Sequence, residues 1–176
     1  WTATSATASD FQAAAAAGFT LVSPTASTSG TSIAFTSIPA GRKRFEILFN
    51  AVGSSGTNHF ELQLGDAGGL ETSGYASPSF YRYAATTHTN SPYDAGAASH
   101  GTGDEAGNTC SGAWSGYLFE ASSFTWVITH MHGTDNTTRG SYGTALKSLS
   151  AELDRISVGW QGAGTFDAGS ISLMYQ

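Results

Sequence analysis

The feature that most constrains the fold is a short-range alternation of apolar and polar residues, repeated in separate segments along most of the chain. Side chains on a β-strand point in turn to the two faces of a sheet, so a period of two predicts strands with one buried face. Clusters of Gly, Ser, Thr, Asn and Pro lie between the segments and predict turns. The predicted strands are 31–35, 44–52, 59–65, 115–120, 123–132, 139–146, 155–160 and 169–175.

Composition decides between a folded sandwich and a disordered chain. Charged residues make up only 11% of the 176 residues, and a low-charge, Gly-rich chain is often disordered. Ten Phe, seven Tyr and four Trp nevertheless supply a large apolar surface that is available for burial. We therefore expect a single folded all-β domain, in which 44–52 and 59–65 form the clearest hairpin.

The first residues break this pattern. Ser9 or Asp10 is a suitable cap for a short helix over 11–17, with Gly18 as its terminating residue. Such a helix is too short to persist alone, so we expect it to lean on another part of an assembly. The sequence thus predicts an N-terminal helix or arm ahead of the β-domain.

Charge and cysteine content exclude several classes of partner. The net charge is −6, and the one basic cluster, at 42–44, is too short to neutralise a nucleic-acid backbone. No apolar run approaches the roughly 20 residues that span a bilayer, so membrane insertion is not expected. Cys110 is the single cysteine, which rules out an intrachain disulfide.

Few residues in the sequence are candidates for metal binding or catalysis. His130 and His132 share one face of a predicted strand, as two ligands of a metal ion would, but a closed site needs further ligands. We expect both on the solvated face, with no metal and no cofactor. The acidic loops 65–69 and 103–107 do not match the ligand spacing of a calcium loop. No nucleophile pattern is present, so the chain is not expected to be an enzyme.

Aromatic residues in and beside the segment 66–108 are the strongest candidates for a binding surface. Tyrosine and tryptophan offer an apolar ring with a polar edge, at little entropic cost on binding, which suits stacking on sugars. The alternative is that several of them close one end of the core, and Trp126 and Trp160 are expected in the core. The predicted ligand-binding residues are Tyr75, Phe80, Tyr81, Tyr83, Tyr93 and Trp114.

Four segments carry a resemblance to a known group of proteins: 38–52, 62–75, 148–156 and 165–175. Together they resemble a jelly-roll domain of tail-fibre-like and uncharacterised structural proteins of tailed phages. The resemblance implies an antiparallel β-sandwich of jelly-roll type over residues 28–176, a virion location, and assembly in the bacterial host cytoplasm. Residues 1–27 lie outside it and are expected to form an attachment arm.

The resemblance also implies a function without catalysis. We expect a tail-fibre or receptor-binding module, with other virion proteins and a host-surface glycan as partners, and a homotrimer as the assembly. One alternative is a capsid decoration or head-fibre protein attached through residues 1–27. Another is a carbohydrate-binding module or a polysaccharide depolymerase.

Overall fold

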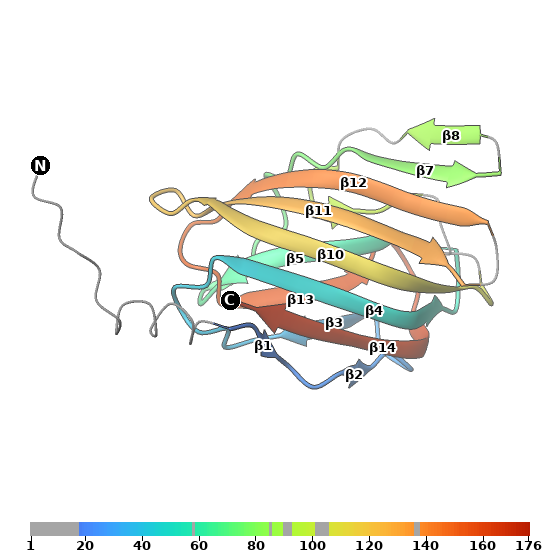
Figure 1. Cartoon of the computed structure of the whole chain (residues 1–176), viewed down its shortest axis with the longest axis horizontal. Helices are drawn as coiled ribbons and strands as arrows, with labels where there is room; N and C mark the ends of the chain where they lie inside the picture. Colours follow the sequence, from blue (N-terminus) through green and yellow to red (C-terminus); the bar gives the residue numbers. More distant parts are fainter. Residues whose placement is uncertain (1–17, 58, 85, 90–92, 101–105, 136–137) are drawn as a thin grey trace, which may run out of the picture.

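The computed structural model describes residues 18–57, 59–84, 86–89, 93–100, 106–135 and 138–176, and every regular element in them is a β-strand (Figure 1). The strands form two antiparallel sheets that pack as a sandwich, which confirms the predicted all-β sandwich. The predicted helix over 11–17 lies outside the described residues. No helix among the described residues is long and apolar enough to cross a membrane.

The larger sheet is ordered β1 (Thr20–Leu21), β14 (Phe166–Tyr175), β4 (Arg44–Ser54), β10 (Thr109–Glu120), β11 (Thr125–Thr134), β12 (Arg139–Ser148), β7 (Ser79–Tyr83) and β8 (Thr86–Thr89), with β2 (Thr25–Ala26) also paired to β14. The smaller sheet is ordered β3 (Ser32–Phe35), β13 (Arg155–Trp160), β5 (Phe60–Asp66) and β6 (Gly69–Leu70), with β9 (Ala97–Ala98) also paired to β5. The smaller sheet covers one face of the larger one, and the other face of the larger sheet is open to solvent. We call the face of the larger sheet that points away from the smaller sheet the open face.

The core lies between the sheets and follows the alternation in the sequence. Phe45, Ile47 and Phe49 on β4 point inward and are buried, as are Leu62 on β5 and Ile156 on β13. The predicted core positions Trp126 and Trp160 are also buried. Each buried large apolar side chain contributes about 1.5–3 kcal/mol to stability, so this aromatic interior is the main source of folding energy.

A β-bulge interrupts β4 and explains one wrong prediction. Ala51 has a φ of 50°, and the pairing of β4 with both β10 and β14 shifts by a residue beside it. The shift turns Val52 inward, where it is buried, although strict alternation predicts it on the face opposite Phe49. Gly169 faces the bulge with a φ of 86°, and a Cβ there would lie 2.3 Å from the Ala51 carbonyl oxygen. Only glycine fits that position.

The predicted hairpin of 44–52 with 59–65 is wrong. These segments become β4 and β5, which lie in different sheets: β4 pairs with β10 and β14, whereas β5 pairs with β13. The turn residues between them carry the chain across from one sheet to the other. Alternation identifies a strand and its buried face, but it does not identify the neighbour to which the strand is hydrogen-bonded.

The last strand also orders part of the N-terminal region. Thr20 and Leu21 pair with Tyr175 and Met174, and residues 25 and 26 pair farther along the same strand. Ser27 is fully buried, and its hydroxyl donates to the Ala168 carbonyl at 2.7 Å. Residues 20–27, which the sequence assigned to the arm, therefore lie along the sandwich.

Candidate functional site

Two of the six predicted ligand-binding residues lie in the interior. Trp114 is fully buried, so its expected exposure is wrong, and Tyr75 is 4% exposed. The Tyr75 hydroxyl accepts a hydrogen bond from the Leu64 amide at 2.7 Å, and the ammonium group of Lys147 lies 5.3 Å from its ring centre. Burial raises the pKa of Tyr75 well above its usual value. Both aromatics hold the core together and are not placed to touch a ligand.

Tyr93 fastens a surface segment to the smaller sheet. It is half-buried, and burial together with the neighbouring Glu61 carboxylate raises the pKa of Tyr93 to about 12. Burial also raises the pKa of Glu61, although the hydrogen bond to Tyr93 opposes this. Gln63 extends the contact by donating to the Ala95 carbonyl at 3.0 Å. Tyr93 therefore belongs to the support of the 93–98 segment.

Tyr81 and Tyr83 form the centre of an aromatic and polar surface at the edge of the larger sheet. They point to the same side of β7, because they are two residues apart on one strand. The guanidinium of Arg139 lies 4.4 Å from the centre of the Tyr83 ring, and Tyr83 is 46% exposed. The ring of Tyr81 meets that of His100 edge-on at 5.1 Å. We call Tyr81, Tyr83, Arg139 and His100 the edge patch.

Phe80 is separated from these tyrosines because it points to the opposite side of β7, onto the open face. There it stacks on Tyr142 of β12, with ring centres 5.4 Å apart and planes 16° from parallel. Tyr142 was not among the predicted residues, because it is distant in sequence and only strand pairing brings it beside Phe80. The predicted aromatic surface is thus divided between two faces of the molecule.

The two histidines of β11 lie inside the sandwich, so the expectation that they face solvent is wrong. His130 and His132 are 6% and 3% exposed, and both rings stack with Trp114. The Trp114 indole Nε1 donates to Nδ1 of His132 at 3.3 Å, and Nε2 of His130 lies 3.3 Å from the Ser141 hydroxyl. Burial lowers the pKa of His130 to about 4 and that of His132 to about 3, where the nearby His130 adds to the effect.

His130 and His132 are the two residues that the sequence suggested as metal ligands. Within the described ranges, no three His, Cys, Asp or Glu side chains come together in a way that could hold a metal ion.

In the loop 65–69, the Asp66 carboxylate accepts hydrogen bonds from the Ser150 hydroxyl and the Gly68 amide. These bonds lower the pKa of Asp66 and tie the loop to the β12–β13 connection. Most of the second acidic loop, 103–107, lies outside the described residues.

A buried ion pair strengthens the same end of the sandwich. Lys147 on β12 points inward, and its ammonium lies 2.6 Å from a carboxylate oxygen of Glu71 and 2.9 Å from the Ser73 carbonyl. Burial raises the pKa of Glu71, but hydrogen bonds from Lys147 and Ser150 outweigh it and leave that pKa lowered. This pair fixes the 71–75 segment against β12.

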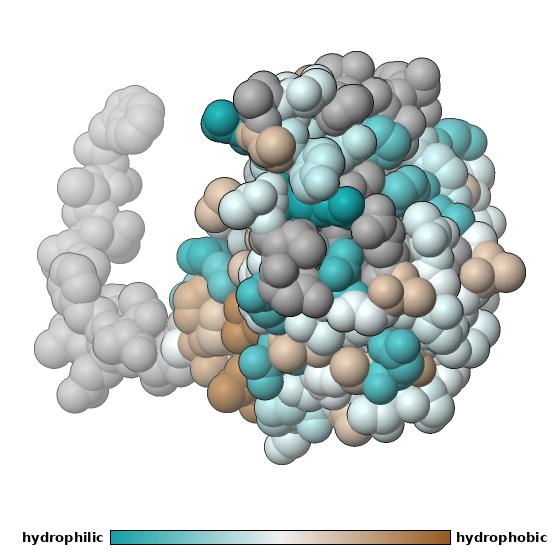
Figure 2. All heavy atoms as spheres, turned by 90° about the vertical axis from the view of Figure 1, so that its right-hand side faces the viewer, coloured by the Kyte–Doolittle hydropathy of each residue, from teal (hydrophilic) through white to brown (hydrophobic). Residues whose placement is uncertain are grey.

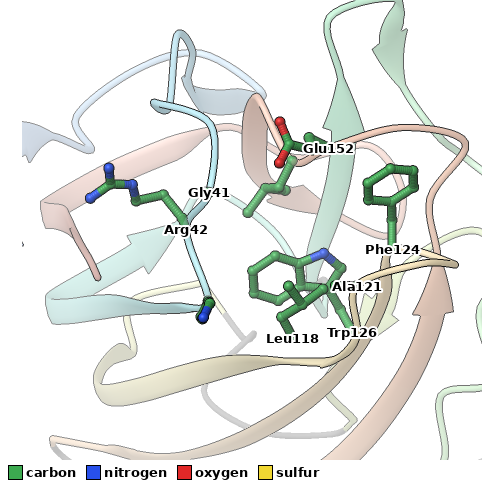
Figure 3. A pocket seen from close by; sticks show the side chains of 9 residues that line it. Gly41, Arg42, Leu118, Ala121, Phe124, Trp126 and Glu152 are labelled. Carbon is green, nitrogen blue, oxygen red and sulfur yellow. The ribbon is translucent and has the colours of Figure 1, made fainter. Parts of the chain in front are cut away.

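A pocket of about 160 Å³ opens at the end of the sandwich near the β10–β11 turn (Figure 3). Trp126, Leu118 and Phe124 form its walls, and Phe124 has a φ of 48°, which is uncommon for an aromatic residue. The guanidinium of Arg42 turns away from the Trp126 ring (Figure 3), and its Nε donates to the Pro39 carbonyl. The walls are therefore mainly apolar, and the volume suits one ring-sized group.

Comparisons with known proteins add no relative: no protein-family model, no curated protein and no solved structure matches this chain.

Proposed function

We propose that this chain is a non-enzymatic jelly-roll module of a tailed-phage virion that contacts a glycan of the bacterial surface. The strand connectivity supports the jelly-roll part of the proposal. The chain passes from β3 in the smaller sheet to β4 in the larger one and back to β5, and the closing strands β13 and β14 repeat this alternation. β13 pairs with β3, and β14 pairs with β4, so the two ends of the chain are wound together as in a jelly roll.

The observation that carries the glycan contact is the edge patch. Tyr83 presents a ring whose orientation the Arg139 guanidinium restrains from one side, and Tyr81 is restrained in the same way by His100. The C–H face of a sugar packs on such rings, while guanidinium and imidazole groups bond its hydroxyls. Because the rings are held before binding, little side-chain entropy is lost.

A resemblance to phage jelly-roll proteins supports the virion part of the proposal. It lies in segments 38–52, 62–75, 148–156 and 165–175. Strands rather than mobile loops present Tyr81 and Tyr83, which suits a surface that docks repeatedly without chemistry. As far as the described residues show, the edge patch contains no carboxylate pair or nucleophile–base pair of the kind that hydrolysis requires.

The test measures binding of the whole chain to a panel of purified bacterial lipopolysaccharides and capsular polysaccharides by biolayer interferometry. We expect at least one polysaccharide to bind, and Tyr83→Ala to weaken that binding about tenfold. A lost stacking contact is worth about 1.4 kcal/mol, which corresponds to that factor. Leu70→Ala is the control, since Leu70 is 39% exposed on β6 of the smaller sheet and lies outside the edge patch.

Equal affinity of the Tyr83→Ala and Leu70→Ala proteins would contradict the edge patch as the contact surface. Release of reducing ends from any polysaccharide of the panel would contradict the non-enzymatic assignment and favour a depolymerase. Immunogold labelling with an antibody to this chain tests its place in the particle. Label on the tail supports an attachment module, and label on the capsid favours a decoration protein.

A further inference from the structure

We infer that the open face of the larger sheet is a contact surface between two copies of this chain. Figure 2 turns the front of Figure 1 to the left, so this face is seen edge-on there, and hydrophobic side chains are visible at the lower end of that margin. The edge patch lies on the reverse side of β7, so this inference does not depend on the proposed glycan contact.

The middle of the open face carries no charged side chain on its three central strands, all of whose residues the structure describes. The side chains turned outward there are Ser111, Ala113, Ser115, Tyr117, Val127, Thr129, Met131, Tyr142, Thr144 and Leu146. Charges lie toward the margins: Arg44 pairs with Glu46 on β4, and Arg82 projects from β7. Glu120 ends β10, and Asp135 accepts a hydrogen bond from Ser111 just beyond β11. An uncharged centre with a polar rim is the usual composition of a protein–protein interface.

Large apolar side chains are exposed at the centre of this face. Met131 is 73% exposed, Tyr142 and Leu146 are each 47% exposed, and Tyr117 is 41% exposed. In the strand register Met131 lies beside Tyr142, and Val127 lies between Tyr117 and Leu146. Thr129 and Thr144 separate these two apolar clusters on the same face. Apolar side chains exposed together on one face of a soluble protein mark contact sites, because water does not solvate them well.

The size of the face fits a stable association. It spans the five strands β4, β10, β11, β12 and β7, which at about 4.8 Å per strand make a width of roughly 24 Å. Strands of about nine residues give a length of roughly 30 Å, so the face measures about 700 Å². A standard interface buries about 800 Å² on each partner. Two open faces in contact therefore meet the requirement of a specific dimer.

The shape of the open face favours a second copy of the chain as its binding partner. β10 contributes only small side chains at its middle, and over Gly112, Ala113 and Ser115 lies an open hollow of about 550 Å³. Met131 and Tyr142 rise directly beside this hollow. Around a twofold axis, the ridge of one copy enters the hollow of the other, and the reverse contact forms at the same time. Because the centre of the face is uncharged, the contact brings no like charges of the two chains, each of net charge −6, directly together.

This twofold contact differs from the threefold assembly that the phage resemblance implies. A contact that uses the same face on both partners closes as a dimer, whereas a trimer requires two different faces on each copy. Mass measurement of the whole chain by size-exclusion chromatography with light scattering separates the two. We expect twice the chain mass of 18.1 kDa at concentrations of tens of micromolar.

Met131→Glu is the decisive variant, because Met131 is the most exposed residue at the centre and its replacement leaves the core untouched. We expect the dimer dissociation constant to rise at least tenfold. Leu70→Glu is the control: Leu70 is an exposed leucine on β6 of the smaller sheet, and its replacement should leave the dimer intact.

Three outcomes would overturn the inference. They are a wild-type protein that stays monomeric up to 100 μM, a trimeric mass, and a dimer that Met131→Glu does not weaken more than Leu70→Glu does. Circular dichroism of both variants shows whether the fold is retained. Should Met131→Glu unfold, Thr129→Glu replaces it, since Thr129 is also exposed on the open face of β11.

Discussion

Acidification from pH 7.5 to pH 5.0 is expected to reduce the free energy of unfolding by about 4 kcal/mol, because of the buried pair His130 and His132. The pKa is about 4 for His130 and about 3 for His132, whereas an unfolded histidine titrates near 6.5. At pH 5.0 the unfolded chain therefore holds two protons that the folded chain does not. This contribution to stability is present above the unfolded pKa of about 6.5 and is lost as the pH falls through the folded pKa values toward 3.

The magnitude follows from the difference in pKa. At pH 5.0 each histidine is about 1.5 pH units below its unfolded pKa, at about 1.4 kcal/mol per unit, so each loses about 2 kcal/mol. The rings that surround the pair come from Trp114, Phe49 and Phe60 and carry no charge that would hold an imidazolium. Such a loss is a large part of the 5–15 kcal/mol that holds a typical domain folded.

The carboxylates with shifted pKa values titrate mainly below this window or act in the opposite direction. The lowered pKa values of Asp66, Glu71 and Glu120 reduce stability mainly below pH 5, where unfolded carboxylates take up protons. Glu61 has a raised pKa, so it favours the folded state on acidification. A Glu61→Gln background removes this opposing contribution and isolates the histidines.

The assay is urea unfolding followed by tryptophan fluorescence at pH 7.5 and 5.0, with free energies extrapolated to zero urea. The double variant His130→Gln/His132→Gln is less stable at both pH values, but its free energy should change little between them. A wild-type change below about 1 kcal/mol would refute the reasoning. So would an unchanged pH dependence in the double variant, or imidazole NMR signals of the pair that titrate above pH 5.

Two further predictions concern the support of the fold. Glu71→Gln leaves the buried ammonium of Lys147 without its carboxylate and should lower the free energy of unfolding by about 2 kcal/mol, less than for a fully buried pair because Glu71 is partly exposed. Glu46→Gln breaks the pair with Arg44, whose side chain is 36% exposed against 6% for Lys147, and should therefore cost less, about 1 kcal/mol, in the same urea assay. Gly169→Ala should cost several kcal/mol, since it adds a backbone clash to a positive φ. Gly41→Ala, with a φ of 80° and open space around it, should cost only about 1 kcal/mol in thermal unfolding; equal losses at the two glycines would contradict the clash.

Local alternation predicts several of the strands but not how they pair, and it does not predict β7, β8 or the first half of β10. The predicted segment 155–160 coincides with β13, and the predicted segments 123–132 and 139–146 lie within two residues of β11 and β12. The pairing of β4 with β10 and β14 depends on contacts that are distant in sequence, and no local signal encodes them. For the same reason the stacking of Phe80 on Tyr142 was missed.

The edge patch was predicted in part. Tyr81 and Tyr83 were singled out as a pair, and their shared side of β7 follows from their spacing alone. Arg139 and His100, which restrain them, come from separate segments that only strand pairing brings together. An aromatic segment in the sequence therefore indicates a candidate surface, while the polar groups that complete it require the fold.

The wrong prediction for His130 and His132 shows most clearly what alternation in the sequence cannot decide. In β11, Trp126 was expected in the core, and counting every second residue from it places His130 and His132 inward. The other alternate residues of β11 are Val127, Thr129 and Met131, and this set is as apolar as the first. Alternation alone therefore does not identify which side of the strand faces solvent. A strand of an antiparallel sheet shows this ambiguity when both of its faces are apolar, as in strands buried on both sides. The core covers one face of β11, and the apolar character of the other is what a second copy packed on the open face would require.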